Sequence, residues 1–352
     1  MKKILFSCWM AGLVLMTSCN GPEEEGSNHG EENMPQLHRS YPVTLVIHGG
    51  AGDITRDNMT PALEKIYRSE LRKALDQGFE LLEQSGSSVE AVVTAIRSME
   101  DSPWFNAGKG AVFTHEKTIE HDASLMDGRT GLAGAVAGVT KIKNPIVAAW
   151  KVMTRSPYVF LIARGAEAFA RDQGLKLVDP AYFRTPRQLD RWRRLQYSKL
   201  SSDKGWEDDH GYLGTVGAVA LDRFGNIAAG TSTGGTINKK YGRVGDSAVI
   251  GAGTYASNDT CGISATGHGE YFIRNVVAYD IASRMKYLGQ SLEKASRVVI
   301  GERLKEIGGS GGVIGLDRNG HIVMEFNTPG MFRGYRQMKG EATVFIYGIR
   351  GK

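Results

Sequence analysis

The chain has 352 residues, of which 41% are hydrophobic and 45 are glycine, a composition typical of a globular protein with many tight turns. Its formal net charge is only +5. The body has no basic stretch interleaved with aromatic residues, so the sequence does not indicate a nucleic-acid-binding protein.

Residues 1–19 have the composition of a secretion signal. Two lysines precede an apolar run, Ile4 to Met16, that is too short to span a membrane as a helix. Small residues then lead to Cys19, as at a bacterial lipoprotein processing site, so Cys19 is expected to be lipidated. The alternative is an ordinary signal peptide cut near the same place. The sequence thus predicts an exported bacterial lipoprotein, anchored in a membrane through its lipid, in the periplasm or at the cell surface.

Residues 20–40 are polar and acidic, with too little apolar content to fold, and are expected to form a disordered tether. After removal of the signal and lipidation, Cys261 is the remaining thiol of the chain. The mature protein is therefore expected to have no internal disulfide.

The folded body is expected to begin with a short apolar strand over residues 42–47. A glycine-rich turn follows, in which His48 is expected to be buried and hydrogen-bonded, not catalytic. Thr60 and Pro61 are a typical cap and first residue of a helix. Ser87 opens a second helix through a capping-box pattern. We expect these two helices to lie in one outer layer.

The middle of the chain is predicted to contain two strands within residues 131–152 and a helix from Ser156 to Ala170. Asp122 and Asp127 favour hydrogen-bonded turns over a carboxylate pair or a metal site. Residues 185–214 are polar and are predicted to form a mobile linker, with a nucleic-acid-binding tail as the weaker alternative.

The chain is organised around a β-hairpin that begins immediately after Gly214. Runs over residues 215–221 and 226–231, rich in small and β-branched residues, flank a four-residue turn. Thr215 opens the first strand, so a cut between Gly214 and Thr215 would create an N-terminal threonine. Its α-amine, with a pKa of about 7.7–8.0, could activate its own hydroxyl. The alternative is a threonine selected only for strand propensity.

The hairpin and five further motifs resemble the plant-type asparaginase and isoaspartyl peptidase family of N-terminal nucleophile hydrolases. The motifs are His48–Gly52, Asn106–Thr114, Asp122–Gly128, Gly242–Ser247 and Thr266–Glu270. The resemblance implies an α+β fold, a four-layer αββα sandwich, and hydrolysis of isoaspartyl dipeptides and L-asparagine. It also implies a chain cut into an α half (residues 41–214) and a β half (residues 215–352), assembled as a dimer of αβ heterodimers.

The same resemblance implies the roles of the site residues. Thr215 would be the nucleophile, supported by a hydrogen bond from Thr233. Arg243 and Asp246 would bind the α-carboxylate and the α-ammonium group of the substrate; the alternative for this pair is a surface salt bridge worth at most about 1 kcal/mol. Thr266 and Gly267, which are expected at the start of a helix, would form the oxyanion hole and contact the substrate; a plain helix cap is the alternative.

No cofactor and no side-chain metal site are expected. The resemblance implies a structural sodium ion held by backbone carbonyls of the loop from Met99 to Lys109. Two other functions stay open. A glycosylasparaginase of the same superfamily usually has Asp-Thr at the cut, where this chain has Gly214-Thr215. A non-catalytic, amino-acid-binding lipoprotein would need no cleavage site.

Overall fold

The computed structural model describes residues 41–200 and 214–348. The predicted signal, the lipidation at Cys19, the tether and the segment 201–213 lie outside the described residues. Within the described ranges, no helix combines the length and the apolar character needed to cross a membrane.

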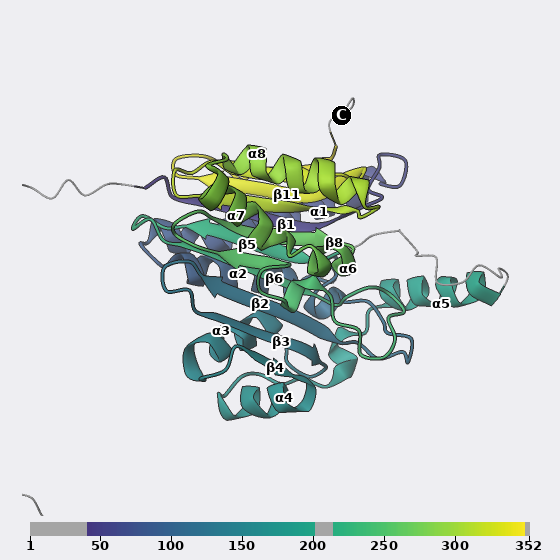
Figure 1. Ribbon diagram of the computed structural model, residues 1–352. Helices are drawn as coiled ribbons and strands as arrows, with labels where there is room; N and C mark the ends of the chain where they lie inside the picture. Colours follow the sequence, from purple (N-terminus) through teal and green to yellow (C-terminus); the bar gives the residue numbers. More distant parts are fainter. Residues whose placement is uncertain (1–40, 201–213, 349–352) are drawn as a thin grey trace, which may run out of the picture. The chain divides into compact units, whose positions relative to one another are not determined.

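The larger of two sheets has eight strands and contains the predicted hairpin (Figure 1). Their spatial order is β12 (Thr343–Tyr347), β11 (Gly330–Gln337), β1 (Thr44–Gly52), β5 (Val216–Leu221), β6 (Ile227–Thr233), β2 (His121–Asp127), β3 (Ala133–Val139) and β4 (Phe160–Ile162). All neighbours are antiparallel except β3 and β4. Strand β5 is therefore hydrogen-bonded on both edges, to β1 and to β6.

A second sheet packs against the first through its strands β8 and β9. Its four strands are, in order, β10 (Ile322–Phe326), β9 (Gly311–Asp317), β8 (Cys261–Gly267) and β7 (Thr254–Ala256). Strand β8 contacts β5 and β6, and β9 contacts β1. The apolar core between the sheets includes Val46, Val219, Ile227, Ile314 and Leu316.

Helices cover the outer face of each sheet. The large sheet is covered by α1 (Pro61–Glu83), α2 (Ser88–Glu100) and α3 (Pro145–Arg155), with α4 (Ala163–Asp172) beside β3 and β4. The small sheet is covered by α7 (Val277–Leu288), α8 (Leu292–Ser296) and the π-helix η4 (Arg297–Leu304), which follow the short α6 (Gly269–Arg274). The described ranges also contain the 3₁₀ turns η1 (Gly108–Gly110), η2 (Pro180–Phe183) and η3 (Asp246–Ala248). The order helix, sheet, sheet, helix confirms the predicted α+β sandwich.

The local signals at the first two helices act as the sequence predicts. The Thr60 hydroxyl accepts a hydrogen bond from the Leu63 amide at 3.3 Å, and both bonds of the Ser87–Glu90 capping box are formed. In α1, a Cβ at Gly78 would lie 2.8 Å from Leu45 Cδ2. This glycine therefore allows the helix to approach strand β1 closely.

Between residues 131 and 170 the structure corrects the sequence prediction. Pro145 begins helix α3, where a strand was expected, because proline is a favourable first helical residue as well as a strand breaker. The helix expected from Ser156 begins only at Ala163. Residues 160–162 instead pair with β3, as the edge strand β4.

The mobile linker predicted over residues 185–214 is corrected in its first part, because residues Pro186–Leu200 form helix α5. Two polar side chains fasten this helix to the body. Gln188 Nε2 donates to the Gly110 carbonyl at 2.7 Å, and Trp192 Nε1 donates to the Thr114 carbonyl at 2.9 Å. The polar composition that suggested a linker therefore belongs to a surface helix with a few specific anchors.

Candidate active site

Thr215 and Thr233 lie side by side at one end of the central hairpin. The register pairs Val216 with Ser232, which places the residue before the first strand beside the last residue of the second. The Thr215 hydroxyl donates to Thr233 Oγ1 at 3.1 Å, and both side chains are buried. The contact expected between the two threonines is thus present.

The carbonyl oxygen of Gly214, next to Thr215, receives two hydrogen bonds. Asn106 Nδ2 donates at 2.7 Å and the Thr233 hydroxyl donates at 3.2 Å. Asn106 is itself held in place, since Nδ2 also donates to the Gly235 carbonyl at 2.7 Å and Oδ1 accepts from the Val112 amide at 3.0 Å. These donors withdraw electron density from the Gly214 carbonyl carbon and favour negative charge on its oxygen.

His48 contacts the backbone of Thr215. Its Nδ1 lies 3.0 Å from the Thr215 carbonyl oxygen, and its Nε2 lies 2.9 Å from Ser264 Oγ. Burial lowers the pKa of His48 to about 3, so the imidazole is neutral and has a single N–H group. A carbonyl only accepts, so Nδ1 donates and Nε2 accepts from Ser264. The prediction of a buried, hydrogen-bonded His48 is confirmed.

One pocket collects most of the predicted site residues. Its lining is Gly214, Thr215, Thr233, Gly235, Thr236, Arg243, Gly245, Asp246, Ser247 and Gly267. Of the predicted residues, Thr266 alone is missing from this lining. Its side chain is fully buried, and its hydroxyl accepts from the Ala51 amide at 3.3 Å.

Thr266 and Gly267 do not start a helix, contrary to the sequence prediction. They end strand β8, and helix α6 begins at Gly269 with His268 as its cap. Gly267 pairs with Gly311 of β9 and continues the strand. The expected dipole contribution at these two residues is therefore lost, although Gly267 still faces the pocket.

Arg243 pairs with a carboxylate that the sequence reasoning did not single out. Its Nε and Nη2 donate to the two carboxylate oxygens of Glu270 at 2.8 and 3.0 Å. This bidentate pair fixes the plane of the guanidinium group. Glu270 ends the Thr266–Glu270 motif, so its place in that motif is the one signal the sequence offered.

Asp246 lies close to Arg243 but does not form an ion pair with it. Its side chain is buried, and Oδ2 has no hydrogen-bond partner among the described residues. Burial raises the pKa of this carboxyl to about 7, against the opposing effect of the Arg243 charge. A Cβ on Gly269 would lie 2.7 Å from Arg243 Nη2 and 3.0 Å from Asp246 Oδ1, so only glycine fits between them. The two charged groups thus flank one small space.

The loop expected to hold an ion has backbone oxygens turned towards its glycines. The Glu100 carbonyl oxygen lies close to Gly108, and the carbonyl oxygens of Phe105 and Pro103 lie close to Gly110. Backbone carbonyls are suitable ligands for a hard cation. In the described part of the chain, no group of three or more His, Cys, Asp and Glu residues could hold a metal ion.

The chain is similar to known proteins over most of its length. The asparaginase family model matches residues 41–346. An isoaspartyl peptidase of Salmonella typhimurium is 45% identical, and the alignment covers 87% of this chain and 98% of that protein. An isoaspartyl peptidase of Escherichia coli is 46% identical, and the alignment covers 88% of this chain and 97% of that protein. The isoaspartyl peptidase/L-asparaginase of Bos taurus is 39% identical, with 82% of this chain and 91% of its own covered.

The predicted localisation is wrong. The sequence predicted an exported, membrane-anchored lipoprotein, but the relatives that the chain matches over almost their whole length are not exported lipoproteins. The family match begins at residue 41, after the segment with Cys19. An apolar run beside a cysteine is a short compositional pattern, and similarity over the whole body outweighs it.

The match to the family extends over both sheets and both helical layers. The motif residues Thr215, Arg243 and Asp246 meet in one pocket at the end of the central hairpin. The chain therefore belongs to the asparaginase family of N-terminal nucleophile hydrolases.

Proposed function

We propose that the protein is a threonine amidohydrolase that cuts its own chain at Gly214-Thr215 and then hydrolyses isoaspartyl dipeptides and L-asparagine. One observation carries the proposal. The Thr215 hydroxyl is positioned by Thr233 directly beside a Gly214 carbonyl that accepts hydrogen bonds from both Asn106 and Thr233. The names of the relatives, isoaspartyl peptidase and L-asparaginase, support the substrate class.

In the first reaction, Thr215 Oγ1 attacks the carbonyl carbon of Gly214. The negative charge that forms on the carbonyl oxygen is stabilised by Asn106 Nδ2 and by the Thr233 hydroxyl. The C–N bond then breaks and the Thr215 nitrogen takes a proton, which leaves an ester between Gly214 and the Thr215 oxygen. Water hydrolyses the ester and yields a Gly214 carboxylate and a free Thr215 α-amine.

In the second reaction, the same hydroxyl attacks the side-chain amide of the substrate. The free α-amine of Thr215 accepts the hydroxyl proton and passes it to the departing ammonia or amine. Water then hydrolyses the aspartyl ester and regenerates Thr215. Arg243, held by Glu270, binds the α-carboxylate of the substrate, and Asp246 binds the α-ammonium group.

Two further parts of the proposal concern ions and assembly. The carbonyl oxygens of Glu100, Pro103 and Phe105 would be ligands of a structural sodium ion, which steadies the loop that leads to Asn106. The active protein would be a dimer of cleaved heterodimers, each with a chain ending at Gly214 and a chain beginning at Thr215. Sedimentation of the purified protein, and stability measured in sodium and in potassium buffers, test these two points.

A denaturing gel tests the proposed nucleophile. Purified protein is expected to give two bands, the smaller one beginning Thr215-Val216-Gly217 on N-terminal sequencing. Thr215→Ala should give one uncut band and no hydrolase activity, whereas the exposed Thr154→Ala should behave as wild type. A Thr215→Ala protein that is cut and active would contradict the assignment.

A substrate panel tests the proposed specificity. We expect turnover of β-aspartyl-leucine and L-asparagine to exceed turnover of glycosylated asparagine. The opposite order would favour a glycosylasparaginase. A protein that stays uncut and hydrolyses none of these substrates would favour a non-catalytic binder.

A further inference from the structure

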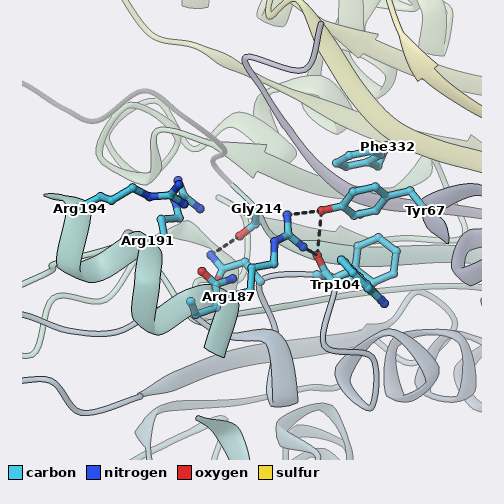
Figure 2. A pocket seen from close by; sticks show the side chains of 11 residues that line it. Tyr67, Trp104, Arg187, Arg191, Arg194, Gly214 and Phe332 are labelled. Atoms are coloured by element: carbon cyan, nitrogen blue, oxygen red, sulfur yellow. Dashed lines mark hydrogen bonds between the residues drawn. The ribbon is translucent and has the colours of Figure 1, made fainter. Parts of the chain in front are cut away.

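A second pocket adjoins the pocket of Thr215. Its lining is Gly49, Tyr67, Trp104, Phe105, Asn106, Arg187, Gln188, Arg191, Arg194, Gly214 and Phe332 (Figure 2). Gly214 lines both pockets, and Asn106 bridges them by donating to the carbonyls of Gly214 and Gly235. Gly214, whose peptide bond to Thr215 would be cut by autocleavage, therefore borders both pockets.

One side of this second pocket is aromatic and the other is basic. The ring of Tyr67 stacks on that of Phe332 with 4.1 Å between centroids. The three arginines follow one another at helical spacing along one face of α5, and Figure 2 shows Arg191 and Arg194 projecting from that helix. The pocket thus combines an apolar surface with guanidinium groups.

Arg187 is positioned by the aromatic side. Its guanidinium lies 5.7 Å from the ring centroid of Tyr67 and 5.2 Å from that of Trp104. It donates to the Tyr67 hydroxyl at 2.7 Å and to the Trp104 carbonyl at 3.4 Å (Figure 2). Arginine has five N–H groups, so others remain for a ligand.

Among the described residues, no carboxylate lies within 4 Å of Arg187 or Arg194. Their exposed neighbour Arg193 differs, since it pairs with Asp190 at 3.5 Å and does not line the pocket. Arg187 and Arg194 can therefore offer N–H donors to an anionic group.

We propose, on the basis of the peptidase function proposed above, that this pocket receives the leaving residue of an isoaspartyl dipeptide. Arg187 and Arg194 bind the α-carboxylate of that residue, and the aromatic side contacts its side chain. The charged groups of the aspartyl residue are engaged at Arg243 and Asp246, so the leaving residue must extend from Thr215 into other space. Release of Gly214 opens such a space towards the arginines.

The leaving group itself provides the test. β-Aspartyl-leucine releases an amino acid with a free carboxylate, β-aspartyl-leucinamide releases the same residue without that charge, and L-asparagine releases only ammonia. A hydrogen-bonded charge pair contributes about 1.5–3 kcal/mol, which corresponds to about 10–100-fold in kcat/KM. We therefore expect wild-type enzyme to prefer the dipeptide acid to its amide by about tenfold or more.

Arg187→Gln and Arg194→Gln should each lower the ratio of kcat/KM for β-aspartyl-leucine to that for asparagine by about tenfold. The preference for acid over amide should shrink by the same factor. Arg193→Gln is the matched control, because Arg193 lies on α5 but does not line the pocket. Because Arg187 also anchors α5, the exposed Arg194 gives a second variant whose folding is less at risk, and autocleavage on a gel verifies each protein.

The inference would be overturned if the kcat/KM ratios between substrates were unchanged in both arginine variants. It would also be overturned if kcat/KM fell equally for all three substrates. Wild-type enzyme that cleaves the amide as fast as the acid would overturn it as well. Failure of the proposed function looks different, because wild-type protein would then hydrolyse neither asparagine nor the dipeptide.

Discussion

The side-chain amide of Asn106 donates a 2.7 Å hydrogen bond to the carbonyl oxygen of Gly214, a residue 108 positions further along the chain. The bond joins the loop after α2 to the segment that leads into β5. It places a fixed donor on the one carbonyl that Thr215 would attack.

Asn106→Ala should slow autocleavage by about 100-fold, because loss of one preorganised donor to an oxyanion typically costs about 10²–10³ in rate. Asn106→Asp should be no faster, since a carboxylate would face the oxyanion. The measurement is the time course of the two fragments on a denaturing gel. Asn58→Ala is the control, because Asn58 is exposed and bonds only locally to Asp53 and Thr55. If Asn106→Ala were cleaved at the wild-type rate, the side-chain amide of Asn106 would not be needed for autocleavage.

Gly214→Ala should slow autocleavage by about 10–100-fold, because overpacking costs about 1–3 kcal/mol. The added Cβ would lie 2.8 Å from Asn106 Cβ and would push the carbonyl away from its donor. Gly165→Ala is a matched control, since no atom lies within 4 Å of the Cβ position there. If the two alanine variants are cut equally fast, packing at Gly214 does not govern the reaction.

The KM for L-asparagine should rise as pH falls through about 7. Asp246 must be ionised to pair with the substrate α-ammonium, and burial raises its pKa to about 7, so each further pH unit leaves about tenfold less of the ionised form. Protonation of the α-amine that the proposed cut would create at Thr215 would lower kcat in a similar pH range. Measuring kcat and KM independently separates the two effects. Asp246→Asn should have a high KM that no longer changes with pH. A wild-type KM that is constant from pH 6 to 8 would contradict this role.

Glu100→Gln should stabilise the fold at high pH relative to wild type. Burial raises the pKa of Glu100 to about 8, although Oε1 accepts from Ser232 and Ile146. The folded state therefore binds more protons than the unfolded state between pH 4.5 and 8. The wild-type free energy of unfolding should fall across that window by about 1.4 kcal/mol per pH unit relative to the variant.

Denaturant unfolding at pH 5 and pH 8 checks this prediction, in a Thr215→Ala background that keeps the chain continuous. The exposed Glu306→Gln should leave the pH dependence unchanged. Parallel curves for wild type and Glu100→Gln would mean that Glu100 does not titrate in this range.

The sequence predicted the parts of the fold that depend on local signals. The caps at Thr60 and Ser87 and the hairpin that follows Gly214 are present as expected. The four-layer order is also present, but it was implied by the family resemblance and not by local signals. Hairpin register also explains why two threonines 18 residues apart could be placed together. Alternation and turn residues are local properties, so they can be read directly from the chain.

The features that the sequence did not predict depend on contacts between distant segments of the chain. Asn106 was placed in a family motif and in an ion-binding loop, but no local pattern connects its side-chain amide with Gly214. The pairing of Arg243 with Glu270 spans 27 residues, and the anchors of α5 reach Gly110 and Thr114. Such contacts are selected by tertiary packing, which a composition-based prediction cannot include.

The placement of β5 has a consequence for the protein after cleavage. This strand lies between β1 and β6, so the segment that starts at Thr215 is bonded to one strand from each fragment. The fragments could separate only by breaking the middle of a continuous sheet. After cleavage, the two fragments would thus be held together by the hydrogen bonds of the shared sheet and would behave as one molecule until the protein is denatured. Dilution alone should not separate them.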